Sequence, residues 1–176
     1  MGRTGALRSG CALRVSQGDF RPRRCSSMPR DCQLVFTNGC FDLLHPGHVD
    51  LLQRARALGD RLIVGLNSDE SVRELKGPTR PIWNEQERAA MLLALRCVDQ
   101  VVIFNERAPA RLIEDLRPDV LVKGGDWSVD RIVGAKTVLK YGGQVHSLPL
   151  LSGYSTSSLI ARLQELQEGS AWRRAS

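Results

Sequence analysis

Two of the three histidines in this chain lie three residues apart, where an apolar segment gives way to an expected helix. The segment from Leu34 to His48 reads L-V-F-T-N-G-C-F-D-L-L-H-P-G-H, and His45 and His48 flank its Pro-Gly pair. A helix start carries unpaired N–H groups and about half a positive charge; Pro46 suits its first turn, and Gly47 lets oxygen atoms approach the backbone. The pattern predicts a nucleotide-phosphate site. The other interpretation is a strand, turn and helix with two structural histidines.

Further charged and hydroxyl side chains follow segments that are expected to be strands. Lys76 and Arg80, in R-E-L-K-G-P-T-R-P, either contact phosphates or belong to a solvated basic loop. Arg88 either reaches a phosphate or pairs with a neighbouring glutamate. Asp126 either binds a nucleotide or caps the following helix. The hydroxyls of residues 155–157 can cap the last helix and still donate hydrogen bonds to phosphates.

The glycines form neither G-x-G-x-x-G nor G-x-x-x-x-G-K-[ST], which disfavours a dinucleotide oxidoreductase and a P-loop NTPase. Instead, apolar strand-like segments alternate with amphipathic ones. Strands are expected near residues 34–38, 62–66, 101–104, 120–123 and 145–150. Helices are expected near residues 48–58, 85–95, 110–116, 132–141 and 156–167, and residues 72–80 are predicted to form a loop. This alternation predicts an α/β fold, a Rossmann-like five-stranded parallel sheet with helices on both faces, whose ligands bind beyond the carboxyl ends of the strands.

The net charge of +6 is confined to residues 1–30, which hold seven arginines and one aspartate. The balanced charge of the remaining chain argues against a nucleic-acid-binding face. Residues 1–30 are predicted to be a disordered, Arg-rich leader: a transit peptide, an ordinary extension, or a start assigned upstream of Met28. We expect one folded domain at 31–168 and a flexible tail at 169–176.

The apolar segments and the cysteines indicate in which cellular compartment the protein is expected. No apolar segment approaches the ~20 residues of a membrane span. The five cysteines contain no Cys-x-x-Cys pair, which disfavours a zinc site and a disulfide framework. A cytoplasmic protein with no membrane partner is expected.

Four segments of the chain resemble the cytidylyltransferase-type nucleotidyltransferases that carry the H-x-G-H motif. They read T-N-G-C-F-D-L-L-H-P-G-H, L-K-G-P-T-R-P, V-L-V-K-G-G-D-W and G-Y-S-T-S. Within that superfamily, the second and third segments resemble the adenylyltransferase branch that makes ADP-heptose from heptose 1-phosphate. The resemblance covers about residues 33–166. Two positions depart from the pattern: Cys40 stands where relatives carry Val or Thr, and Ser157 replaces the last Thr of S-T-T.

The resemblance implies transfer of AMP from ATP to a sugar 1-phosphate, with Mg²⁺ arriving on the nucleotide and no metal ligands from the protein. The catalytic residues that it implies are His45, His48 and Lys76. The residues implied in nucleotide binding are Thr37, Asn38, Cys40, Phe41, Gly47, Arg88, Gly125, Asp126, Ser155, Thr156 and Ser157. Those implied in acceptor binding are Asp42, Arg80 and Lys123.

The resemblance also implies partners. The family often occurs fused to a sugar kinase, for which this chain has no room, so a separate heptose kinase is expected. The family tends to form homodimers, and Val101–Phe104 offers an apolar surface for one. The alternatives are a CTP-dependent polyol or amino-alcohol phosphate cytidylyltransferase, an FMN adenylyltransferase, or a nucleotide-sensing module without turnover.

Overall fold

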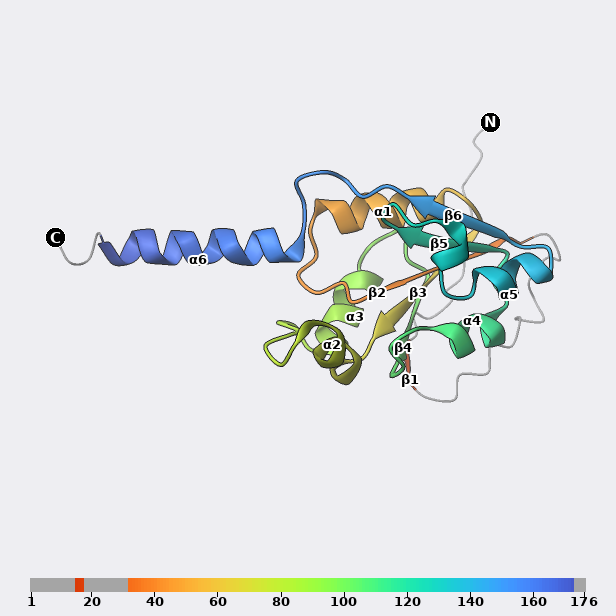
Figure 1. Ribbon diagram of the computed structural model, residues 1–176, viewed down its shortest axis with the longest axis horizontal. Coiled ribbons are helices and arrows are strands. Elements are labelled where there is room, and N and C mark those ends of the chain that lie inside the picture. Colours follow the sequence, from red (N-terminus) through yellow and green to blue (C-terminus); the bar gives the residue numbers. More distant parts are fainter. Residues whose placement is uncertain (1–14, 18–31, 173–176) are drawn as a thin grey trace, which may run out of the picture.

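The computed structural model describes residues 15–17 and 32–172, and these form a parallel sheet with helices packed on it (Figure 1). The six strands lie in the order β1-β4-β3-β2-β5-β6. The strands are β1 Val15–Gln17, β2 Leu34–Gly39, β3 Arg61–Asn67, β4 Gln100–Phe104, β5 Val120–Gly124 and β6 Gln144–Leu148. The helices are α1 Pro46–Arg56, α2 Asp69–Lys76, α3 Glu85–Leu93, α4 Ala110–Leu116, α5 Ala135–Lys140 and α6 Thr156–Trp172, with a 3₁₀ turn at Val129–Arg131.

Helices cover both faces of the sheet, as the alternating pattern predicts. Side chains of α1 and α3, such as Leu52 and Leu92, pack with one face of the strands. Side chains of α4 and α5, such as Ile113, pack with the other face. Successive residues of a strand point to opposite faces, and β2 shows this directly: Val35 belongs to the first cluster and Phe36 to the second, both fully buried.

The centre of the sheet determines where a ligand can bind. β2 pairs with β3 on one side and with β5 on the other, so the chain order reverses at β2. Parallel α/β sheets bind ligands beyond the carboxyl ends of the strands at such a reversal. The loop from Gly39 to Pro46 begins at this edge, and β5 ends there at Gly124. Both segments carry predicted site residues.

The predicted loop at residues 72–80 is wrong in its first half, because α2 extends to Lys76. The side chain of Ser68 caps this helix by accepting a hydrogen bond from Ser71 N–H. Acidic residues occupy the first turn and basic residues the last, which suits the helix dipole. Only Ser71 and Val72 of α2 are buried, so the helix lacks the apolar stripe on which the prediction depended.

The ends of the chain also differ from the prediction. Val15–Gln17 pairs with β4 as a sixth, edge strand, so the predicted disorder of the leader does not hold for these three residues. The other residues of the predicted leader lie outside the described residues. Helix α6 continues to Trp172, beyond the predicted start of the tail at 169, and extends away from the body of the protein (Figure 1). No helix among the described residues is long and apolar enough to span a membrane.

Candidate functional site

The two histidines form a stacked pair at the start of α1. His45 is the N-cap residue, and its carbonyl oxygen accepts a hydrogen bond from His48 N–H at 2.9 Å. The two rings are nearly parallel, with centroids 3.7 Å apart. The Phe41 ring meets the His48 ring edge to face, with centroids 5.2 Å apart. This stacking holds both imidazoles over the first turn of α1.

Both histidines are neutral at neutral pH. Burial, followed by the charges of His45 and Lys76, lowers the pKa of His48 to about 4, although Asp42 opposes the shift. Burial also lowers the pKa of His45. The Nδ1 atoms of both rings are buried without a hydrogen-bond partner. Buried polar groups in folded proteins are normally satisfied, so these two nitrogen atoms are suited to a ligand that supplies partners.

Gly47 is required by the closeness of its neighbours. A Cβ atom at this position would lie 3.1 Å from His45 Nδ1 and 3.3 Å from Tyr154 Cβ. The missing side chain therefore allows the turn before α6 to approach the histidine pair. Gly47 is predicted to give phosphate oxygens access to the backbone, and the structure adds this packing role. Tyr154 was not singled out as a site residue.

Lys76 reaches the same site from α2. It is the last residue of that helix and is exposed. Its positive charge is one of the causes that lower the pKa of His48. The structure therefore brings the three predicted catalytic residues, His45, His48 and Lys76, into one electrostatic environment.

Asp42 and Arg80, both predicted to bind the acceptor, are paired with each other. Asp42 is 1% exposed, and its carboxylate accepts hydrogen bonds from Arg80 Nε at 2.7 Å and from Ile82 N–H at 3.0 Å. Trp83 N–H donates to it as well, at 3.2 Å. Burial alone would raise the pKa of Asp42, but the hydrogen bonds from Ile82, Arg80 and Trp83 outweigh it, and the pKa lies below its ordinary value. The two side chains form a buried ion pair, in which Arg80 Nη2 lies 2.7 Å from the carboxylate but makes no hydrogen bond.

Arg88 is also held by partners within the protein. Its guanidinium is fully buried and donates to the carbonyl oxygens of Cys40, Asn67 and Trp83 at 2.6–3.0 Å, and to the Asp69 carboxylate at 2.7 Å. The neighbouring glutamates considered for it are not among these partners. Its donors join the ends of β2 and β3 to the start of α3, so it supports the site from beneath.

Lys123, Asn38 and Thr37 form a second polar group at the ends of β5 and β2. Lys123 Nζ lies 3.4 Å from Asn38 Oδ1. Burial lowers the pKa of Lys123, and the nearby Cys40 acts in the opposite direction. The hydroxyl oxygen of Thr37 is buried without a hydrogen-bond partner. These residues occupy the reversal point of the sheet and retain capacity for a polar ligand.

The Gly124–Trp127 turn is tied to β6. Gly125 has a φ of 114°, and its N–H donates to the Leu148 carbonyl at 2.8 Å. Ser147, which the sequence did not indicate, donates its hydroxyl proton to the Gly125 carbonyl and accepts from Trp127 N–H. Asp126 is exposed. It does not cap the next helix, because Ser128 precedes the 3₁₀ turn and Gly134 precedes α5.

The three hydroxyl residues at the start of α6 have different roles. Thr156 is 8% exposed, and its hydroxyl donates to the Asp42 carbonyl oxygen at 2.7 Å. Ser155 caps the helix through reciprocal hydrogen bonds with Ser158. Ser157 is exposed. Thr156 therefore anchors α6 to the loop before α1, whereas Ser155 and Ser157 remain at the surface of the helix start.

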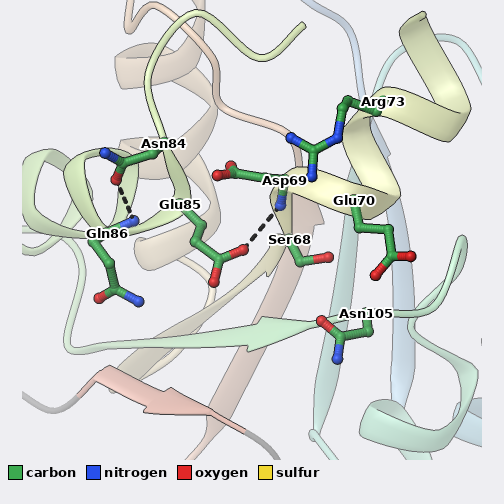
Figure 2. A pocket seen from close by; sticks show the side chains of 8 residues that line it. All are labelled: Ser68, Asp69, Glu70, Arg73, Asn84, Glu85, Gln86 and Asn105. Carbon is green, nitrogen blue, oxygen red and sulfur yellow. Dashed lines mark hydrogen bonds between the residues drawn. The ribbon is translucent and has the colours of Figure 1, made fainter. Parts of the chain in front are cut away.

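A separate hollow of about 550 Å³ lies where the first turns of α2 and α3 meet (Figure 2). Its lining residues are Ser68, Asp69, Glu70, Arg73, Asn84, Glu85, Gln86 and Asn105. None of them is a predicted site residue. The two helix starts are already satisfied from within: the Glu85 carboxylate accepts from Asp69 N–H, and Asn84 accepts from Gln86 N–H. This hollow is distinct from the histidine site.

Comparison with known proteins places the same residues in a family. The cytidylyltransferase-like family profile matches residues 36–162. Over 132 residues the chain is 59% identical to the bifunctional protein HldE of Koribacter versatilis, which covers 75% of this chain and 27% of that protein. It is 56% identical over 135 residues to the bifunctional protein HldE of Syntrophotalea carbinolica, with 77% and 28% covered. The chain thus spans less than a third of the length of these curated relatives.

A solved structure shows the same fold. It is the lipopolysaccharide core biosynthesis protein from Thermoplasma volcanium, which matches with a TM-score of 0.55 and 28% sequence identity. The match covers 70% of this chain and 99% of that protein.

Proposed function

Because the chain belongs to the cytidylyltransferase-like family, we propose that it is an adenylyltransferase that transfers AMP from ATP to heptose 1-phosphate. The products are ADP-heptose and pyrophosphate. The observation that carries this proposal is the stacked His45–His48 pair, whose Nδ1 atoms are buried without partners at a helix start. The high identity to the HldE proteins over the matched region supports the heptose branch.

In the proposed reaction, a phosphate oxygen of the sugar 1-phosphate attacks the α-phosphorus of ATP. A new P–O bond forms, the bond from the α-phosphorus to the bridging oxygen breaks, and pyrophosphate leaves with that electron pair. The acceptor phosphate is already ionised, so no strong general base is needed. The chain's task is to position the reactants and to stabilise charge on the phosphoryl oxygens.

The histidines and Lys76 divide this task. The neutral rings of His45 and His48 donate hydrogen bonds to oxygens of the reacting phosphate. Lys76, with its charge close to His48, neutralises the triphosphate. Gly47 leaves the N–H groups at the start of α1 accessible, and Ser155 and Ser157 contact the outer phosphates from the start of α6.

The nucleoside and the acceptor occupy the ends of β2 and β5. Thr37, Asn38, Cys40 and Phe41 border the nucleotide on one side, and Gly125 and Asp126 border it on the other. Lys123 supplies positive charge for the acceptor phosphate. Asp42, Arg88 and Thr156 act on these ligands through the segments they hold in place, because their polar groups have partners in the protein. Arg80 shares the pair with Asp42, while its Nη2 atom has no hydrogen-bond partner.

Mg²⁺ belongs to this reaction as part of the Mg·ATP substrate. The described residues contain no group of three or more His, Cys, Asp or Glu side chains able to hold a metal ion. The carboxylate of Asp42, an acidic residue predicted at the site, is occupied by Arg80 and by two backbone N–H groups. The residues present do not fit a metal held by the protein, and no step is assigned to one.

A homodimer in the cytoplasm is the proposed state. The surface predicted for the dimer at Val101–Phe104 is wrong, because these residues are 0–6% exposed within the sheet. The exposed Leu163 and Leu166 on α6 offer an apolar surface instead. Light scattering at micromolar concentration tests the dimer. The acceptor, heptose 1-phosphate, must itself be made by a sugar kinase. We propose that this kinase reaction takes place at a separate active site.

The decisive experiment measures pyrophosphate release with different substrate pairs. We expect turnover with ATP and D-glycero-β-D-manno-heptose 1-phosphate, and at least about tenfold slower turnover with CTP. Equal use of CTP, or activity with glycerol 3-phosphate or FMN but not with the heptose, would favour the alternative transferases. Binding of ATP without pyrophosphate release on any acceptor would favour a nucleotide-sensing module.

A further inference from the structure

Asp42 joins three segments that are far apart in the sequence. Its carboxylate holds Arg80 and the N–H groups of Ile82 and Trp83, which follow α2. Its own carbonyl oxygen accepts the hydroxyl proton of Thr156, at the start of α6. The side chain is 1% exposed, so these partners replace water almost completely. One residue therefore connects the loop before α1, the segment after α2 and the first turn of α6.

The backbone around Asp42 is strained in a way that requires these contacts. Phe41 and Leu43, on either side of it, have φ values of 45° and 54°. Side chains with a Cβ atom rarely adopt this left-handed conformation, and it persists where the surroundings over-determine it. The loop therefore adopts an unfavourable conformation to bury the Asp42 carboxylate between its partners.

Arg88 holds the same two segments through other backbone atoms. It donates to the carbonyl oxygens of Cys40, in the loop before α1, and of Trp83. Trp83 is thus fixed at both backbone atoms, by Asp42 through its N–H and by Arg88 through its carbonyl. The side chain of Trp83 nevertheless remains 42% exposed. Burial of an apolar side chain therefore does not explain why this backbone is held so firmly.

We propose that Asp42 and Arg80 are positioning residues, whose buried ion pair closes the 77–83 segment onto the loop before α1 and so holds Lys76 beside His48. Arg80 lies four residues after Lys76, and its side chain is only 11% exposed in the pair with Asp42. A mobile segment would let the exposed ammonium group of Lys76 move away from the histidines. The proposal rests on the proposed function only where it assigns Lys76 to the triphosphate.

The closure itself can be tested without any substrate. In Arg80→Gln, we expect the amide protons of Ile82 and Trp83 to exchange with solvent at least about tenfold faster, because the local structure that protects them opens more often. Exchange at Val64, in the centre of β3, should not change. The matched control is Arg73→Gln, which removes an exposed arginine from α2 itself. Unchanged exchange at Ile82 and Trp83 in Arg80→Gln would overturn the proposal.

The positioning of Lys76 is tested by the affinity for Mg·ATP, measured by calorimetry. Arg80→Gln should weaken binding about fivefold, and combining it with Lys76→Ala should weaken binding no further than Lys76→Ala alone, because the two changes remove the same interaction. Additive losses would overturn the proposal. So would unchanged Mg·ATP affinity with a raised KM for the heptose phosphate, since Arg80 would then be an acceptor ligand.

A second variant keeps the test valid if Arg80→Gln does not fold. Arg80→Lys retains the charge but loses the planar fork of donors. It should change amide exchange and Mg·ATP affinity in the same directions as Arg80→Gln, but by smaller factors. If amide exchange and Mg·ATP affinity change as expected but the heptose reaction does not occur, the proposed substrate is rejected. The positioning role of Asp42 and Arg80 would stand in that case.

Discussion

Two groups of polar side chains meet beyond the end of β2, and they differ in how far their hydrogen-bonding capacity is used. His45 and His48 each retain a buried Nδ1 atom without a partner. Arg88 and the carboxylate of Asp42, in contrast, are surrounded by partners at 2.6–3.2 Å. A buried polar group without a partner is costly unless a ligand satisfies it. The first group is therefore available to a ligand, whereas the second belongs to the fold.

This difference teaches how to separate ligand-binding residues from supporting ones. Both groups consist of charged or titratable side chains beyond the ends of parallel strands, where the fold class places ligands. Only their hydrogen-bond partners in the folded protein distinguish the two groups. The comparison predicts that loss of Arg88 acts mainly on stability, and a change in the histidine pair acts mainly on turnover.

The largest expected effect is on stability, in Arg88→Met. The change leaves three carbonyl oxygens and the Asp69 carboxylate without their buried donor. Breaking a buried charged network costs about 3–5 kcal/mol. Urea unfolding measures the loss. In the control, Arg54→Met, the exposed pair with Asp50 is broken, and the cost should stay below about 1 kcal/mol. A stable Arg88→Met protein that no longer binds ATP would instead make Arg88 a phosphate ligand.

The opposite behaviour is expected of the histidines. His45→Ala and His48→Ala should each lower kcat by about 10²–10³-fold, the scale for removing one preorganised donor to a developing charge. The Kd for Mg·ATP should change far less, because the donors act mainly in the transition state. Single-turnover rates and calorimetric titration measure the two quantities. Turnover of both variants at the wild-type rate would place the active site elsewhere.

The pH dependence of stability offers a further test of the histidine pair. An unfolded chain titrates its histidines near pH 6.5, whereas burial, His45 and Lys76 lower the pKa of His48 in the folded protein to about 4. Between these values the unfolded state binds more protons, so the free energy of unfolding falls as the pH is lowered from about 6.5 to 4. The expected loss is up to about 3 kcal/mol.

His48→Gln, which does not titrate, should lose this component of the pH dependence when unfolding is measured across the same range. The contribution of Asp42 lies lower, because its folded pKa is already below the ordinary value of 3.8. That contribution is lost only as the pH falls further. Identical pH profiles for the wild type and His48→Gln would contradict the assigned shift of His48.

The sequence predicted the alternation of strands and helices well, because buried parallel strands such as Leu62–Leu66 are continuous apolar segments. It did not predict α2, whose stability depends on the Ser68 cap and on charge placement rather than on an apolar stripe. It also missed β1, since three residues in an Arg-rich segment carry no strand pattern. These elements depend on partners that only the folded chain provides.

The candidate site was likewise predictable only in part. The H-P-G-H spacing identified the stacked pair, and strand ends identified Lys123. The assignments of Asp42, Arg80 and Arg88 to ligands stay predictions. A basic or acidic residue near a phosphate site has the same sequence signature whether it contacts the ligand or a backbone carbonyl. The long-range partners of Asp42, at positions 80–83 and 156, leave no trace in local spacing.

The smallest expected effect concerns the edge strand β1, far from both polar groups. A chain that starts at Met28 lacks Val15–Gln17 and leaves the outer edge of β4 without its partner. Only three residue pairs between β1 and β4 are lost, and β4 keeps its pairing with β3. We therefore expect a loss of stability of about 1 kcal/mol. The proposed ligand site lies beyond the carboxyl ends of β2 and β5, and β4 and β3 separate it from β1. We therefore expect kcat/KM to remain within about twofold of the wild type. Thermal unfolding and pyrophosphate release measure the two quantities. A shortened chain that folds normally but loses turnover would show that the leader contributes to the site.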